Sequence, residues 1–289
     1  MNKHLIKPKQ KNEVLLSDIN AFESDTAFKV WWLGQSGFLI KWKGKYLLLD
    51  PYLSDSLSVK YQHTDKPHVR MSELVIAPEK LNFIDIVTSS HNHTDHLDAE
   101  TLMPILKNNT AIKLIIPEAN RTFVVDRIKC DIDFPIGLND GLSAELEGFK
   151  ITGLPSAHNA VERNEKGECK FMGYIIQFGG YAVYHSGDTM LFDGLEEILK
   201  VYHPDIAFLP INGNKPERKV AGNLNPEEAA KLGKAIGAKL VVPHHYHMFE
   251  FNTEDPLLFA EQCKLQQVDY KVLELGEGMV FGAGPDGQL

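Results

Sequence analysis

Cysteine is scarce in this chain, which argues against a disulfide-stabilised fold. Only three occur among 289 residues, Cys130, Cys169 and Cys263, and they are widely separated. This spacing gives no disulfide framework, so a reducing cytoplasm is the expected compartment. The basic segment 1–11 also lacks the apolar stretch of a signal peptide.

Long apolar runs, internal repeats and low-complexity linkers are missing as well. No stretch approaches the roughly 20 apolar residues of a membrane span, so no spanning segment is expected. Hydrophobic residues make up 43% of the chain, enough to bury a large core, and single domains commonly reach this length. The sequence therefore predicts one domain over residues 1–289.

Basic charge is in short supply: 30 Lys and Arg face 39 Asp and Glu, for a net charge of −9. An acidic surface disfavours general nucleic-acid binding, which needs a basic footprint. A local positive pocket for a phosphorylated small molecule remains compatible, because bound metal ions would supply much of its charge. We expect a small-molecule substrate and no nucleic-acid partner.

The most informative stretch is His91-Asn92-His93-Thr94-Asp95-His96-Leu97-Asp98. Its first six residues contain three histidines and one aspartate, shortly after the apolar run 84–88, which predicts a strand. A loop at the carboxyl end of that strand could hold two metals side by side, each completed by ligands from elsewhere. The alternative is a plain polar loop in which Asp98 caps a helix.

Further candidate ligands follow other strand-like segments. They are His158 after residues 149–154, Asp188 after residues 181–185, and the pair His244-His245 at the end of residues 240–243. Rigid scaffolds commonly place catalytic groups where a buried strand meets a loop.

Strands and helices alternate in two β-rich halves. The predicted strands are 29–40, 45–50, 84–88, 113–116, 149–154, 172–178, 181–185, 206–209 and 240–243. The predicted helices are 99–108, 118–125, 194–201, 226–236 and 256–266. Gly179-Gly180 predicts a hairpin turn, and residues 54–78 a mobile loop. This pattern favours an α/β (α+β) fold, a four-layer αββα sandwich.

The order HxHxDH, then His, Asp and His, resembles the metallo-β-lactamase superfamily of metal-dependent hydrolases. Three segments resemble its L-ascorbate-6-phosphate lactonase-like branch: Trp31-Trp32-Leu33-Gly34-Gln35-Ser36-Gly37, Tyr184-His185-Ser186-Gly187-Asp188 and Val242-Pro243-His244-His245. The similarity begins near Phe28, which leaves residues 1–27 as an N-terminal extension. It implies an αββα sandwich with a dinuclear metal site at one edge of the sheets.

The resemblance and the strand-end positions together predict the ligands. One metal is expected on His91, His93 and His158, the other on Asp95, His96 and His245, with Asp188 bridging the two. A hydroxide between the metals would be the nucleophile, and Asp95 would also carry a proton to the leaving oxygen. The lactonase resemblance implies manganese, and these ligands also suit zinc. Iron is less expected, because diiron relatives place Glu where this chain has His93.

Residues beside the ligands receive supporting roles. In the resembling family the ligand follows Pro243 by two residues, which selects His245, while His244 would pack or line the pocket. Asp50 is predicted to orient a ligand histidine through its free ring nitrogen, or else to cap a turn. His185 is predicted to support the ligands from behind.

Substrate contacts are predicted at Asn212-Gly213-Asn214 and at Tyr246, with turn formation and a solvated loop as the alternatives. A nearby basic cluster would receive a phosphate or form a solvated charge run; its members are Lys215, Arg218 and Lys219. His247 either touches substrate or belongs to a loop. Four histidines are predicted to be surface residues without a chemical role: His4, His63, His68 and His203.

Three functional hypotheses follow. The first is a hydrolase of a lactone or ester of a small sugar acid, with or without a phosphate. The second is a phosphodiesterase of the phospholipid or cyclic-nucleotide type, because such relatives share the ligands. The third is a non-catalytic metal-binding protein. The resemblance also implies a homo-oligomer.

Overall fold

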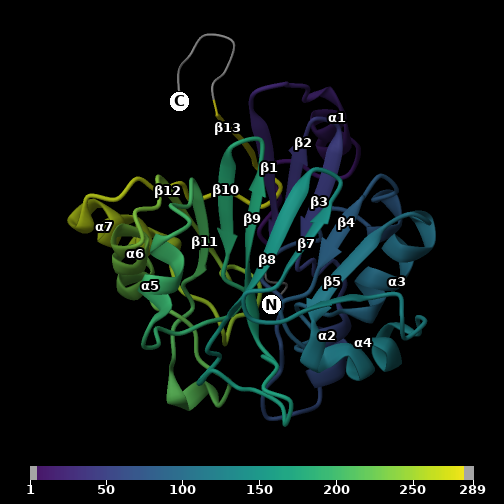
Figure 1. Cartoon of the computed structure of the whole chain (residues 1–289). Coiled ribbons are helices and arrows are strands. Elements are labelled where there is room, and N and C mark those ends of the chain that lie inside the picture. The colour runs from purple at the N-terminus through teal and green to yellow at the C-terminus, as the bar shows by residue number, and fades with distance from the viewer. Residues whose placement is uncertain (1–4, 283–289) are drawn as a thin grey trace.

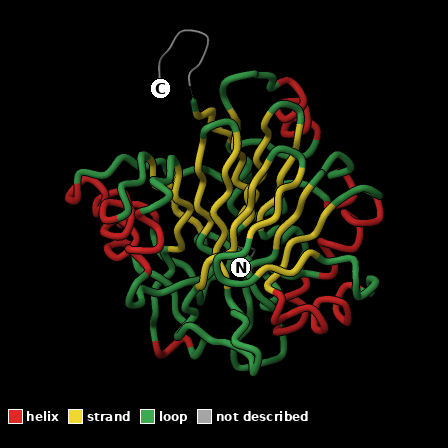
Figure 2. Tube along the Cα trace, in the orientation of Figure 1, coloured by secondary structure: helices red, strands yellow, loops and turns green. Residues whose placement is uncertain are grey.

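A computed structural model describes residues 5–282, in which two β-sheets lie against each other with helices flanking them (Figure 1, Figure 2). This is the predicted αββα arrangement. The first sheet has the order β13-β1-β2-β3-β4-β5-β6. Its strands are β1 (Phe28–Gly34), β2 (Gly37–Trp42), β3 (Lys45–Leu49), β4 (Ile86–Thr88), β5 (Lys113–Pro117), β6 (Ile136–Leu138) and β13 (Gly278–Phe281).

The second sheet has the order β12-β11-β10-β9-β8-β7. Its strands are β7 (Ser143–Leu146), β8 (Phe149–Pro155), β9 (Met172–Phe178), β10 (Tyr181–His185), β11 (Ile206–Pro210) and β12 (Leu240–His244). Strands β10, β11 and β12 are parallel, and β8 runs in their direction because both β8 and β10 are antiparallel to β9. The loops after β8, β10 and β12 therefore leave the same edge of the sheet.

Helices α2, α3 and α4 lie on the side of β4 and β5, and α5, α6 and α7 on the side of β11 and β12 (Figure 1). The bounds are α1 (Glu13–Ala21), α2 (Ser56–Tyr61), α3 (Ala99–Asn108), α4 (Arg121–Ile128), α5 (Leu195–Lys200), α6 (Pro226–Ala235) and α7 (Pro256–Gln266). Short 3-10 turns occur at η1 (Pro78–Lys80), η2 (Glu118–Asn120) and η3 (Pro216–Arg218). No helix among residues 5–282 is both long and apolar enough to cross a membrane.

The core lies between the inner faces of the sheets. Phe38 on β2 stacks on Phe208 on β11, with ring centroids 4.0 Å apart. Farther along the interface Phe28 on β1 meets Phe178 on β9 edge-on at 5.0 Å. Such aromatic pairs add to the burial of apolar area that holds the two sheets together.

Most predicted elements are confirmed, including β9, β10, α3 and α7 at the expected residues and the hairpin turn at Gly179-Gly180. The single strand predicted over residues 29–40 is wrong. Gly34 and Gln35 have φ angles of 101° and 50°, so the chain turns there and β1 and β2 pair as a hairpin. The predicted loop 54–78 contains α2, which the sequence pattern did not indicate.

Part of the predicted N-terminal extension is built into the fold. Helix α1 buries Leu15 and Ile19 completely against the core. Its Asp18 accepts hydrogen bonds from Lys29 Nζ at 2.6 Å and Trp31 Nε1 at 2.8 Å, both on β1. Residues 1–4, including His4, lie outside the described residues.

Candidate metal centre

The loop after β4 carries the histidine-rich stretch and is held by its own backbone. The main-chain oxygen of His93 accepts hydrogen bonds from the N–H groups of His96 and Leu97, at 3.1 and 2.9 Å. At its end Asp98 caps α3 by accepting from the Thr101 N–H at 3.0 Å. The capping role and the candidate ligand roles are therefore compatible, because different residues of the stretch serve them.

All seven predicted ligands converge at one edge of the sandwich. His158 follows β8, Asp188 follows β10, and His245 follows β12. Three sets of side chains bring their ligand atoms within 4.8 Å of one another: His91, His93 and His158; His91, His96 and Asp188; and Asp95, His96 and His245. The topology thus brings four separate loops, those after β4, β8, β10 and β12, together in one cluster.

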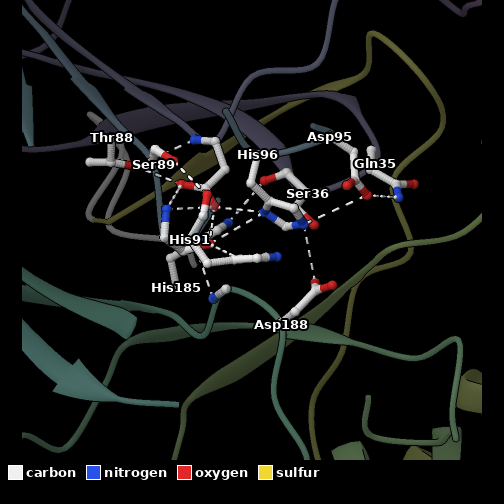
Figure 3. A network of polar contacts seen from close by, with 12 residues as sticks. Gln35, Ser36, Thr88, Ser89, His91, Asp95, His96, His185 and Asp188 are labelled. Atoms are coloured by element: carbon white, nitrogen blue, oxygen red, sulfur yellow. Dashed lines mark hydrogen bonds and ion pairs between the residues drawn. The ribbon is translucent and has the colours of Figure 1, made fainter. Parts of the chain in front are cut away.

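Asp188 contacts three histidines of the cluster, and Figure 3 shows its contact with His96. Its Oδ1 is 3.3 Å from His96 Nε2, and its Oδ2 is 3.6 Å from His158 Nε2 and 3.4 Å from His245 Nε2. One carboxylate therefore approaches histidines of both predicted ligand sets, as a bridging ligand must.

The donor set fits divalent metal ions. His91 Nε2, His96 Nε2 and Asp188 Oδ1 are buried and make no hydrogen bond. Leaving such atoms without a partner costs roughly 1–3 kcal/mol each, which a cation coordinated by them would offset. Imidazole nitrogen and carboxylate oxygen are ligands of zinc and of manganese.

The charge states of the cluster agree with this fit. Burial lowers the pKa of His91 well below its ordinary value and that of His158 to about 4, so both are neutral and offer a lone pair. Burial would also lower the pKa of His96, but the carboxylates of Asp188 and Asp95 raise it well above its ordinary value. These carboxylates stabilise positive charge at this point, whether it is a proton or a cation.

Groups behind the cluster fix its rings. Asp50 accepts a hydrogen bond from His96 Nδ1 at 2.8 Å, and the Gly222 main-chain oxygen accepts one from His158 Nδ1 at 2.8 Å. Both rings therefore present Nε2 to the cluster. Burial would raise the pKa of Asp50, yet His96 and His185 hold it below its ordinary value.

His185 and His244 lie one layer deeper. His185 donates from Nε2 to the Ser36 main-chain oxygen at 2.9 Å and accepts at Nδ1 from the Gly187 N–H at 3.3 Å, beside Asp188. The ring of His244 stacks on that of His185 at 5.3 Å, and its Nδ1 is 3.0 Å from Ser36 Oγ. His244 thus faces the core and His245 the cluster.

A cleft of about 450 Å³ opens above the cluster, a size that suits a small molecule. His93, Asp95, His158, Asp188 and His245 form its floor, and Tyr61, His68, Phe249 and Phe251 an aromatic wall. Lys60, Lys66, Arg127 and Lys219 are its basic residues. Among the described residues, the acids that line it are Asp95 and Asp188 alone.

The prediction that His68 lies on the surface is wrong, because its side chain is half-buried and lines the cleft. His68 stacks on Tyr61 at 4.3 Å and meets Phe251 edge-on at 4.6 Å, in the aromatic wall. Backbone hydrogen bonds, including Glu250 N to Val69 O at 3.0 Å, join the segment that contains His68 to the distant segment that contains Phe251. No local pattern in the sequence predicts that long-range pairing. His63 and His203 are exposed, as predicted.

The predicted substrate residues do not line the cleft. Tyr246 is 1% exposed, stacks on Trp32 and donates its hydroxyl to the Leu273 main-chain oxygen at 2.5 Å, so it packs in the core. Asn212 is fully buried and donates to Asn252 Oδ1 at 2.9 Å. Asn252 lines the cleft, whereas Asn212, Gly213 and Asn214 do not.

The three residues of the predicted basic cluster do not share one location in the structure. Lys215 pairs with Glu254 at 2.7 Å, and Arg218 donates to the main-chain oxygens of Asn212 and Thr253. Only Lys219 of the three reaches the cleft, where its main-chain oxygen accepts from Lys66 Nζ at 2.6 Å.

An αββα sandwich that gathers five histidines and two aspartates at one edge defines a metallo-β-lactamase-fold, metal-dependent hydrolase. A sequence profile described as "Beta-lactamase superfamily domain" matches residues 29–245. A UPF0173 metal-dependent hydrolase of Methanosarcina mazei is 31% identical over 255 residues, 86% of this chain and 96% of the relative. The chain therefore belongs to the β-lactamase superfamily and, within it, to the UPF0173 metal-dependent hydrolase family.

Solved structures support the fold. Igni18, a metallo hydrolase from the archaeon Ignicoccus hospitalis, is 26% identical with a TM-score of 0.65, over 89% of this chain and 99% of that one. An isothiocyanate hydrolase from Delia radicum gut bacteria has a TM-score of 0.69 at 19% identity, over 88% and 100% of the two chains. The latter similarity shows the fold alone.

Proposed function

We propose that this hydrolase opens a lactone or ester of a small sugar acid that carries an anionic group such as a phosphate. Two divalent cations, manganese or zinc, would serve it. One observation carries the proposal: Asp188 approaches histidines of both ligand sets, on the floor of a cleft whose charged lining residues other than Asp95 and Asp188 are basic.

The ligand assignment follows the positions of the side chains. His91, His93 and His158 would hold one cation, Asp95, His96 and His245 the other, and Asp188 would share both. When bound, the cations supply Lewis acidity, which acidifies water and polarises a carbonyl. No serine or cysteine nucleophile is then needed.

Asp95 suits the transfer of a proton. Its side chain is 16% exposed, against 3% for Asp188, so it is the floor carboxylate that opens to the cleft. From that position it would take a proton from the attacking water and return it to the leaving alkoxide.

The basic rim supports an anionic substrate. Lys60, Lys66 and Lys219 lie around the cleft of a protein whose net charge is −9. The hydrogen bond from Lys66 to the Lys219 main chain joins the two rim segments. A phosphate near these side chains would be attracted by them and by the cations below.

The free thiols of Cys130, Cys169 and Cys263 support a cytoplasmic location.

The test is a substrate panel with manganese- or zinc-loaded protein: a phosphorylated sugar-acid lactone, the same lactone without phosphate, and a model phosphodiester. We expect fastest turnover of the phosphorylated lactone. Preferential phosphodiester cleavage would favour the phosphodiesterase alternative, which the same rim could serve. No turnover of any substrate by fully loaded protein would contradict the proposal.

A further inference from the structure

Gln35 stands out in the turn between β1 and β2. Its φ of 50° lies in the left-handed region, which is unfavourable by roughly 1–2 kcal/mol for a residue other than glycine. Its side chain is nevertheless only 1% exposed. A polar amide is buried at such a position only when it has partners there, and strained backbone often marks a functional site.

The amide of Gln35 reaches two members of one ligand set. Its Nε2 is 2.8 Å from Asp95 Oδ2 (Figure 3) and 3.1 Å from His245 Nε2. Its main-chain oxygen accepts a hydrogen bond from the His245 N–H at 3.0 Å. The turn between β1 and β2 in the first sheet is thus hydrogen-bonded to the end of β12 in the second sheet, next to Asp95 and His245.

These distances place the end of the amide among the donor atoms. Asp95 Oδ2 lies 3.6 Å from His245 Nε2 and 3.7 Å from His96 Nε2. Atoms that coordinate one ion at about 2.1 Å lie roughly 3–3.5 Å apart. The terminal amide atom of Gln35 is as near to Asp95 Oδ2 and His245 Nε2 as fellow ligands are.

The other amide atom, Oε1, is buried and has no hydrogen-bond partner. A half-turn of a glutamine amide exchanges the positions of its nitrogen and oxygen, and the surrounding hydrogen bonds and charges decide which orientation is adopted. An N–H at this position would direct a positive hydrogen at a cation, whereas the oxygen would direct a lone pair. We propose that Gln35, through its amide oxygen, is a ligand of the cation held by Asp95, His96 and His245.

Gln35 increases the chemical difference between the two ligand sets. The set of His91, His93 and His158 offers only nitrogen. With Gln35, the second set offers a carboxylate and a carbonyl oxygen beside its histidines, which shifts its preference toward manganese relative to zinc. The inference rests on the metal centre of the proposed function but not on its substrate.

Two variants of the full chain separate the possible roles of the amide. Gln35→Met removes both polar atoms at similar length, and Gln35→Glu keeps an oxygen and adds charge. Gln177→Met, at the far end of β9, is the matched control. The metal-free proteins are titrated with Mn²⁺, with free Mn²⁺ followed by electron paramagnetic resonance, and with Zn²⁺ against a chelator. Thermal unfolding of the metal-free proteins checks their fold.

We expect Gln35→Met to lower the Mn²⁺ affinity of the site formed by Asp95, His96 and His245 roughly 10-fold or more. The loss of Zn²⁺ affinity should be smaller. Gln35→Glu should bind at least as tightly as the wild type, and Gln177→Met should match it. If Gln35 served only as an N–H donor to Asp95, Gln35→Glu would bring two carboxylates together and bind as weakly as Gln35→Met. That result, or unchanged Mn²⁺ affinity in Gln35→Met, would overturn the ligand assignment alone. A wild type that binds no cation would overturn the proposed function with it.

Discussion

Asp50 Oδ2 lies 2.8 Å from His96 Nδ1, and both side chains are fully buried. Asp50 is itself held by hydrogen bonds from Thr88 Oγ1 at 3.0 Å and from the Ser90 N–H at 3.1 Å. Because the ring donates to Asp50 through Nδ1, Nε2 is left to face Asp188. A residue that directly follows β3, 46 positions earlier in the chain, thus fixes the orientation of a cluster histidine.

Replacement of Asp50 by asparagine tests this relationship. Asp50→Asn keeps the size of the side chain but removes its charge, so His96 becomes a weaker and less well oriented ligand. We expect cation affinity to fall roughly 10–100-fold, the usual effect of losing such a partner. Competition with a chelator measures it. The control is Asp205→Asn, a buried carboxylate that binds Ala182 N and Lys239, which should change stability and leave cation affinity intact.

Asp188→Ala removes the carboxylate that approaches both ligand sets. We expect metal content to fall below that of the wild type, by elemental analysis, and hydrolysis to drop at least 1,000-fold, about 4 kcal/mol of transition-state stabilisation. Retention of both metals and of activity would contradict the dinuclear site.

The candidate ligands could be predicted because their signals are local. A dense HxHxDH stretch and single residues at strand ends are visible without knowledge of the fold. Asp50 was predicted as a supporting residue because it ends an early strand that lies near the site in the resembling fold. A helix cap could also be predicted: Asp98 accepts a hydrogen bond from the Thr101 N–H at the start of α3.

The remaining features depend on contacts between distant segments. Tyr246 follows a ligand in sequence, but its stacking on Trp32 at 4.3 Å directs it into the core. His68 belongs to the cleft only because its segment pairs with the one containing Phe249. Gln35 contacts Asp95 across 60 residues of chain. No periodicity or spacing encodes such pairings.

The neighbouring histidines at the end of β12 should behave differently. His245→Ala is expected to lower cation affinity with little change in the stability of the metal-free protein, since His245 faces the cluster. His244→Ala removes a fully buried ring from the core, so it should cost about 2–4 kcal/mol in free energy of unfolding. Urea denaturation and metal titration of both variants measure the two effects. The reverse pattern would show that His244 faces the metals.

The contact between α1 and β1 should make stability depend on pH. Burial raises the pKa of Asp18, but hydrogen bonds from Lys29 and Trp31 outweigh it and hold the pKa below its ordinary value. The stabilisation from ionised Asp18 is therefore present above about pH 4 and is lost as pH falls through the folded-state pKa.

We expect Asp18→Asn to cost about 1 kcal/mol at pH 7, because the site is partly exposed, and less at pH 3. Urea denaturation of the metal-free proteins at both pH values gives the comparison. Asp126→Asn, on the exposed side of α4, serves as control. An equal difference at both pH values would show that the charge of Asp18 is not the cause.

The basic rim allows a paired test of substrate charge. Lys219 lines the cleft, whereas Lys215, four residues earlier, is engaged by Glu254 and does not line it. Lys219→Met should raise KM for the phosphorylated lactone about 5-fold, near 1 kcal/mol, with kcat unchanged and with no effect on the lactone without phosphate. Lys215→Met should leave both substrates unaffected.

Salt provides a second measurement of the same interaction. Because mobile ions screen exposed charges, KM of the wild type for the phosphorylated lactone should rise with ionic strength, and that of Lys219→Met should rise less. An equal rise of KM for both lactones in Lys219→Met would mean that Lys219 shapes the cleft instead of attracting the anion.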